Sequence, residues 1–160
     1  MLFIYLLNML VTITTDASFY HEYKVGGYAF WITSQRGRKA LAGAFKDDVV
    51  SSNDAEFKCV VNSLYQLKAL GWEVTQIYVN TDSQAVMNSI EGRHDKLPEY
   101  AKATLKQYED ILVKLNNPVV SARHVKAHKH TKTARHWCNQ WCDDNARKAA
   151  KNKIKKMGYK

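Results

Sequence analysis

Apolar and β-branched residues gather in five short stretches, which predicts five β-strands over residues 10–15, 25–33, 38–46, 74–81 and 119–125. The first of them, Leu10 to Thr15, alternates between apolar and polar residues, as a half-buried strand does. Residues 34–37 separate the second and third strands and end in Gly37, which can adopt a positive φ in a hairpin turn. The first three strands are therefore expected to form an antiparallel meander.

Apolar residues at helical spacing predict four helices. In the first helix they recur from Phe57 to Leu70, between N-cap candidates at 52–54 and a stop at Gly71. Further helices are expected over 83–90 and 99–115, joined by a polar connector at 91–98, and from about 133 to 155. A break at 116–118 precedes the fifth strand, and a basic loop at 127–132 follows it.

The resulting order, β-β-β-α-β-α-α-β-α, predicts an α/β protein. Three antiparallel strands followed by two helix-connected strands imply a five-stranded mixed sheet flanked by helices. A chain of 160 residues is long enough for one core and short for two. We expect one domain over 1–160, with an apolar N-terminal extension at 1–8 and a basic C-terminal tail at 151–160.

Net charge and cysteine content indicate which kinds of binding partner and which cellular compartment to expect. A net charge of +9 favours a polyanionic partner, with nucleic acid ahead of a membrane surface. Three cysteines in no disulfide spacing favour a reducing, cytoplasmic compartment. Residues 1–7 are apolar but too short to span a bilayer, and no basic segment precedes them. They are interpreted as an extension of the first strand, or as residues upstream of a start at Met9.

Four carboxylates occupy settings that suit a metal site. Asp16 and Asp82 each follow a predicted strand, Glu56 lies in the first turns of a helix, and Asp143 lies within the last helix. Carboxylate oxygens from strand ends and helices can converge into a pocket for a hard cation such as Mg²⁺. In a strongly basic protein, this pattern points to metal-assisted phosphodiester chemistry.

The neighbours of these acids carry a family resemblance. Along the chain occur Thr15-Asp16-Ala17-Ser18, Asn53-Asp54-Ala55-Glu56, Thr81-Asp82-Ser83-Gln84, Val125-Lys126-Ala127-His128 and Asp143-Asp144-Asn145-Ala146-Arg147. In order and content, from about residue 10 to 150, they resemble the motifs of the type 1 ribonuclease H family. The resemblance implies the ribonuclease H-like fold. It also implies endonucleolytic hydrolysis of the RNA strand of RNA–DNA hybrids. No protein partner is implied, and a monomer is expected.

The resemblance also assigns roles. It implies two Mg²⁺ or Mn²⁺ ions, bridged by Asp16, with Glu56 and Asp82 on one ion and Asp143 on the other. Asp144 competes for the last position, but Asp143 shares a helix face with Asn139 and Arg147. His128 is the expected proton-transfer or product-release residue, with His130 as its competitor. The expected substrate contacts are Ala17, Asn53, Gln84, Asn139 and Arg147.

The chain departs from the family around the substrate. Ala17 replaces a usual glycine, Glu22 replaces a substrate-contacting asparagine, and the loop that follows His128 is longer than in typical bacterial members. The basic, Trp-rich protrusion of well-studied members is absent, because residues 91–99 are short and mixed in charge. The segment 147–160 carries seven Lys or Arg and no acid, so it is a candidate replacement, or simply a solvated helix end.

Other interpretations remain open. Histidines and cysteines between 124 and 142 are dense enough for Zn²⁺: His124, His128, His130, His136, Cys138 and Cys142. Trp137 and Trp141 are expected in the core, with a base-stacking platform as the alternative. The same fold could also serve a junction resolvase, a transposase-type nuclease or an exonuclease, or a hybrid- or double-stranded-RNA-binding module without activity.

Overall fold

The computed structural model describes residues 9–95, 97–125 and 133–159 of the chain. Five strands form one sheet: β1 (Leu10–Tyr20), β2 (Val25–Ser34), β3 (Gly37–Ala44), β4 (Gln76–Thr81) and β5 (Val119–His124). Their order in the sheet is β3-β2-β1-β4-β5. The pairs β1–β2 and β2–β3 are antiparallel, whereas β1–β4 and β4–β5 are parallel. This is the predicted mixed sheet.

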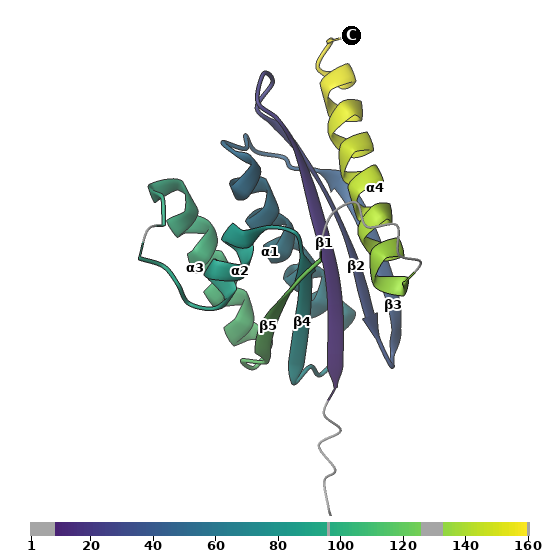
Figure 1. Ribbon diagram of the computed structural model, residues 1–160, viewed down its shortest axis with the longest axis vertical. Helices are drawn as coiled ribbons and strands as arrows, with labels where there is room; N and C mark the ends of the chain where they lie inside the picture. Colours follow the sequence, from purple (N-terminus) through teal and green to yellow (C-terminus); the bar gives the residue numbers. More distant parts are fainter. Residues whose placement is uncertain (1–8, 96, 126–132, 160) are drawn as a thin grey trace, which may run out of the picture.

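Helices cover both faces of the sheet. The four helices are α1 (Ser52–Leu70), α2 (Gln84–Ile90), α3 (Glu99–Lys114) and α4 (Ala134–Lys156). Figure 1 shows α1 and α3 together on one face and α4 crossing the other face over β1, β2 and β3. The largest apolar cluster fills the space between the sheet and α1, with Ile13, Leu64 and Ile77 fully buried in it.

Strand β1 is longer than the sequence predicts, and the extra length changes the setting of Asp16. Its pairing with β4 stops at Thr14, opposite Asn80, whereas its pairing with β2 continues to Tyr20. Asp16 therefore lies inside β1, and the expectation that it ends a strand is wrong. The edge of β1 that faces β4 has no strand partner at Asp16, because the pairing with β4 has already ended. Asp82 comes directly after the end of β4.

Helix and turn ends follow local chemistry, with one shift. Ser51 is the N-cap of α1, since its Oγ accepts a hydrogen bond from the Asp54 N–H at 3.0 Å, so the cap lies just before the predicted 52–54. Gly71 ends α1 with φ 72° and Gly37 has φ 143° in its turn, as predicted. Ser83 is the N-cap of α2, at the start of the helix predicted over 83–90.

The tryptophans divide between packing and exposure. Trp31 on β2 meets Trp137 and Trp141 of α4 edge to face, with ring centroids 5.1 and 5.3 Å apart. Trp141 is half-buried against the cluster under α4, whereas Trp137 is 58% exposed. The expected core position is therefore wrong for Trp137. Within the described part of the chain, every helix lacks the combination of length and apolar character that a bilayer span requires.

Close packing of α4 on the sheet depends on Gly27 of β2. A Cβ at this position would lie 2.0 Å from the Ala146 carbonyl oxygen and 2.8 Å from the Ala150 nitrogen. Both atoms belong to the helix backbone, so the helix itself would have to move. We expect Gly27→Ala to lower the free energy of unfolding by about 3 kcal/mol, measured by urea denaturation.

Gly43→Ala provides the control for this substitution. The Cβ added there would meet the Tyr28 hydroxyl at 2.8 Å, and that side-chain tip can rotate away. Its cost should stay near ~1 kcal/mol. Equal losses of stability in the two variants would contradict the argument that the α4 backbone sets the limit at Gly27.

Candidate active site

One cavity collects the predicted site residues. It has a volume of about 620 Å³ and lies where β1, the end of β4, the start of α1 and the middle of α4 meet. Every predicted site residue that the structure describes lines it: Asp16, Ala17, Asn53, Glu56, Asp82, Gln84, Asn139, Asp143 and Arg147. His128 lies outside the described residues. Segments separated by up to about 130 positions along the chain thus share one hollow.

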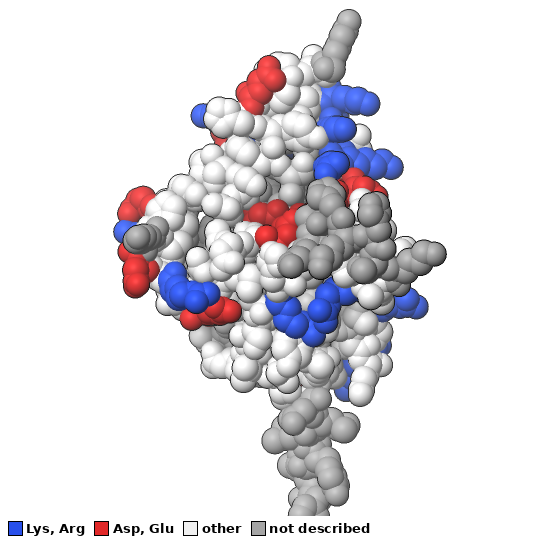
Figure 2. All heavy atoms as spheres, in the orientation of Figure 1, with Lys and Arg blue, Asp and Glu red and all other residues white. Residues whose placement is uncertain are grey.

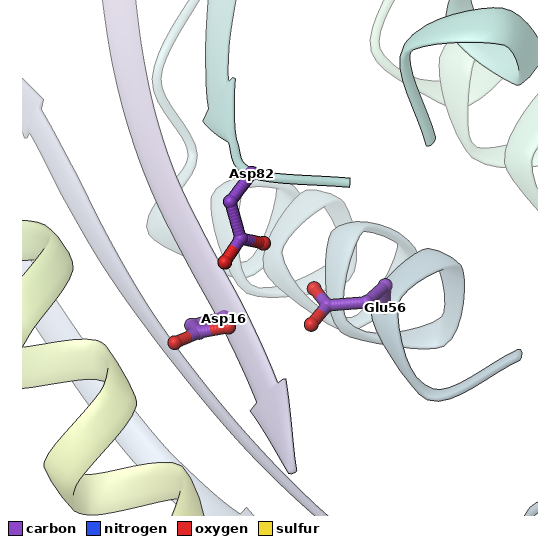
Figure 3. A group of neighbouring side chains, drawn as sticks. All are labelled: Asp16, Glu56 and Asp82. Carbon is purple, nitrogen blue, oxygen red and sulfur yellow. The ribbon is translucent and has the colours of Figure 1, made fainter. Parts of the chain in front are cut away.

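Three carboxylates form the centre of this cavity. One oxygen from each of Asp16, Glu56 and Asp82 lies within 4.8 Å of the others. Figure 3 shows the three side chains pointing toward one another from β1, α1 and the end of β4. Asp16 and Glu56 are buried and Asp82 is half-buried. Figure 2 shows a group of acidic side chains in the middle of this face, with basic side chains near it and further acidic side chains toward the left edge.

Backbone geometry explains how two of these acids are held. The Ala17 N–H donates to Asp16 Oδ1 at 3.0 Å and to Glu56 Oε1 at 3.2 Å. The Cys59 thiol of α1 donates to the carbonyl oxygens of Asp16 and Ala29, each at 3.3 Å. One turn of α1 therefore docks on β1 and β2 at the level of Asp16, and this contact sets the position of Glu56.

Crowding and burial oppose ionisation of the acids. Burial, followed by the negative charges of Asp82 and Asp143, raises the pKa of Asp16 from 3.8 to about 7. Burial, followed by the charges of Asp16 and Asp82, raises the pKa of Glu56 well above its ordinary value. Without a counter-charge, the site therefore holds protons that isolated carboxylates release.

The donor set fits a divalent cation. Among the described residues, Glu56 Oε2 is buried and has no hydrogen-bond partner, although a buried carboxylate oxygen normally has one. Carboxylate oxygens are the ligands of hard cations, and the three acids lie close enough to bind one ion together. A cation here would supply both the missing partner of Glu56 and the positive charge that would let the acids ionise.

Asp143 and Asp144 lie in different surroundings. Asp143 lines the cavity, and its Oδ2 forms an ion pair with Arg147 Nη2 at 2.9 Å. Asp144 points away, where its Oδ1 accepts from Gln140 Nε2 at 2.9 Å. Asn139, Asp143 and Arg147 share the helix face that the sequence predicts. Asp143 does not join the tight group of three acids, and it faces them from the rim.

The cavity also contains residues that the sequence reasoning missed, among them Ser18, Ser52 and Gln140. Ser18 follows Asp16 by two positions on β1, so the strand period could have identified it. Gln140 precedes Asp143 by three positions on α4, so the helical period could have identified it as well. Ser52 had no such signal, because it depends on how α1 docks.

The zinc interpretation finds no support among the described residues. The one group of three possible ligands there is the carboxylate group, and it includes none of His124, His136, Cys138 and Cys142. Cys142 lies on the buried face of α4, where its thiol donates to the Thr14 carbonyl oxygen of β1 at 3.5 Å. His128 and His130 lie outside the described part.

Solved structures share this fold at low sequence identity. LC11-RNase H1 in complex with an RNA/DNA hybrid has a TM-score of 0.72 and 15% identity, covering 90% of this chain and 99% of that one. The N-terminal RNase H domain of rv2228c from Mycobacterium tuberculosis has a TM-score of 0.74 and 16% identity, with 94% and 99% covered. RNase H1 from Halobacterium salinarum has a TM-score of 0.67 and 17% identity, with 89% and 98% covered.

Sequence comparison agrees with the structural comparison. Searching the curated proteins returned no significant match. The family model described as RNase H, however, matches residues 8–151, which include all four acids of the cavity. This match and the five-stranded mixed sheet show that the chain belongs to the RNase H family.

Proposed function

We propose that this protein is a divalent-metal-dependent endonuclease that hydrolyses the RNA strand of RNA–DNA hybrids. The observation that carries the proposal is the convergence of Asp16, Glu56 and Asp82 within 4.8 Å in a chain of the RNase H family. LC11-RNase H1, which has the same fold, was solved with an RNA/DNA hybrid. The net charge of +9 supports a nucleic-acid substrate.

The acids have a common task in this proposal. Asp16, Glu56 and Asp82 would hold one Mg²⁺ or Mn²⁺ ion, and Asp143 together with Asp16 would hold a second. Bound cations would activate a water molecule and stabilise the charge that develops on the phosphate and the leaving oxygen. Four carboxylates would carry a charge of −4, which balances two divalent cations. The Ala17 N–H keeps Asp16 and Glu56 adjacent.

Polar side chains around the acids suit recognition of RNA. Asn53 and Gln84 line the cavity next to Glu56 and Asp82. Their amide groups can donate and accept hydrogen bonds, as reading a 2′-hydroxyl in a minor groove requires. Asn139 and Arg147 line the cavity from α4, and Ala17 lines it from β1. We propose that these five residues contact the hybrid and that His128 assists proton transfer or product release.

Two further properties belong to the proposal. All three cysteines are free, which fits a reducing, cytoplasmic compartment. The protein would act as a monomer, because all four acids of the site come from one chain.

Comparing cleavage of four substrates tests the proposed activity. Hybrid, double-stranded RNA, double-stranded DNA and a four-way junction would each be incubated with the protein in Mg²⁺ and in Mn²⁺. We expect cleavage of the RNA strand of the hybrid, none in EDTA, and a loss of at least about 10³-fold in Asp82→Asn. The matched control is Asp110→Asn on the exposed side of α3, which should cleave like the wild type.

The outcomes separate the possible functions. An intact hybrid together with cleavage of a junction or of double-stranded DNA would replace the proposal with another nuclease of this fold. Binding of hybrid without cleavage in either metal would identify a binding module instead.

A further inference from the structure

One face of α4 is strongly basic and joins the candidate active site. Its exposed residues Arg147, Lys148, Lys151 and Lys155, here called the basic strip, line a shallow hollow of about 480 Å³ together with Asp144 and Asn152. Arg147 also lines the carboxylate cavity, so this residue borders both hollows. Figure 2 shows Lys and Arg side chains gathered over the C-terminal half of α4, beside the acidic centre.

The three lysines of the strip form no ion pair within the described part of the protein. Arg147 pairs with Asp143. Lys153, by contrast, turns inward and donates to the Phe45 carbonyl oxygen at 2.6 Å. Of the strip residues, Lys155 alone lies in the last turn of α4, where the helix dipole favours a cation. The dipole therefore does not account for Lys148 and Lys151.

The dimensions of the strip match a nucleic-acid backbone. At about 1.5 Å per residue, Lys151 lies ~12 Å and Lys155 ~18 Å along the helix from Asp143. A strand that advances about 3.4 Å per nucleotide covers this distance in roughly four to five nucleotides. A duplex with its scissile phosphate at the carboxylates could therefore place further phosphates along the strip.

We propose that the basic strip is a binding surface for the phosphate backbone of the hybrid, on one side of the scissile bond. This inference rests on the proposed function, because it assumes that the hybrid occupies the carboxylate cavity. The proposed phosphate contacts are the lysines on one exposed face of α4, beginning in the middle of the helix. Lys153 is not among them. It also accounts for affinity in a chain without the family's basic protrusion.

The test neutralises two lysines of the strip and two matched lysines elsewhere. Lys151→Gln/Lys155→Gln changes one mid-helix and one last-turn lysine of α4. Lys106→Gln/Lys114→Gln makes the same change on α3, where Lys106 is exposed and Lys114 lies in the last turn. Both pairs alter the net charge equally. Circular dichroism melting would first verify that each variant folds.

Binding of an 18-base-pair hybrid would be measured in EDTA at several salt concentrations. We expect the strip variant to reduce the slope of log K against log salt by about 1.8, since each phosphate contact contributes about 0.9. Affinity at moderate salt should fall about tenfold, and the control pair should match the wild type. In Mg²⁺, KM should rise by a similar factor with kcat unchanged, because such contacts bind substrate and transition state equally.

Position along the duplex gives a second readout. Two hybrids would carry a short RNA patch near opposite ends of otherwise DNA strands, so that the duplex extends to one side of the cleavage site or to the other. Only one of them should show the increase in KM, because the strip lies on one side of Asp143. Equal increases for both hybrids would overturn the placement of the backbone along α4.

Failure of this inference is distinguishable from failure of the proposed function. If wild-type protein cleaves hybrid but the strip variant keeps its salt slope, the inference is wrong and the activity stands. Equal loss of slope in both variants would show a net-charge effect and would also overturn it. Loss of binding to phosphatidylserine vesicles, with hybrid binding unchanged, would assign the strip to a membrane instead. If the strip variant shows the reduced salt slope for hybrid binding but the wild-type protein cleaves no hybrid, only the proposed function would be overturned.

Discussion

Replacing Asp16 with asparagine is expected to lower the rate of hybrid cleavage by at least about 10³-fold, which corresponds to about 4 kcal/mol of transition-state stabilisation. Asp16 lies among the other acids, and the negative charges of Asp82 and Asp143 both raise its pKa. The amide keeps the size of the side chain and can accept the Ala17 hydrogen bond, but it removes the negative charge. Single-turnover cleavage of a saturating hybrid in Mg²⁺ measures the effect.

The last helix provides the companion comparison. Asp143→Asn should lower cleavage strongly, because Asp143 lines the cavity. Asp144→Asn should change it less than about threefold, because Asp144 does not line the cavity and its carboxylate accepts a hydrogen bond from Gln140. Loss of metal-dependent cleavage in Asp144→Asn, with Asp143→Asn active, would show that the assignment of the fourth acid is wrong.

The same Asp16→Asn substitution is expected to stabilise the metal-free protein above neutral pH, by about 2–4 kcal/mol. The pKa of Asp16 is about 7 in the folded protein, against an ordinary value of 3.8. The folded state therefore binds this proton more tightly than the unfolded state does. Below about pH 4 both states hold the proton, and the stability contribution is fully present. As the pH rises through 7 it is lost, because the folded state must accept a buried charge.

Asparagine does not titrate, so the gain in stability should grow between about pH 4 and 7 and then remain constant. Urea denaturation in EDTA at pH 5, 6, 7 and 8 measures this profile. Excess Mg²⁺ should reduce the difference, because a bound cation stabilises only the state that binds it, and the wild type binds it better. A variant that is less stable than the wild type at pH 8 in EDTA would contradict the proposed electrostatic strain.

A conflict between stability and function follows from these two predictions. The acids that are proposed to hold the metal repel one another in a partly dry cavity, so the site costs folding free energy. Asn139 Oδ1 and Glu56 Oε2 are also buried without a hydrogen-bond partner among the described residues. Such unsatisfied groups are uncommon in native interiors unless a ligand completes them.

Local patterns were sufficient for most of the elements. Turn chemistry at Gly37 and Gly71 and the apolar spacing from Phe57 to Leu67 act within a few residues, so they can be read without knowing the fold. Errors arose where long-range pairing decides. Strand β1 continues past Asp16 because β2 supplies a partner up to Val25, and nothing in the residues around Asp16 indicates this.

For the site, the sequence by itself determined the chemical groups and their order along the chain: four acids, three amides and a basic last helix. Local motifs and family resemblance reveal these, because they depend on residue type and spacing. The tertiary structure alone decided which of them meet. Asp16, Glu56 and Asp82 converge because β4 ends beside an extended β1 and α1 docks through Cys59.

The structure also placed Asp143, the acid that the helical period favours, in the cavity and left Asp144 out of its lining, and it brought the lysines of α4 next to the cavity as one strip. The physical reason is the same in each case. Burial, mutual repulsion and surface continuity depend on distances between residues far apart in the chain, and only the packing of the sheet and helices sets those distances.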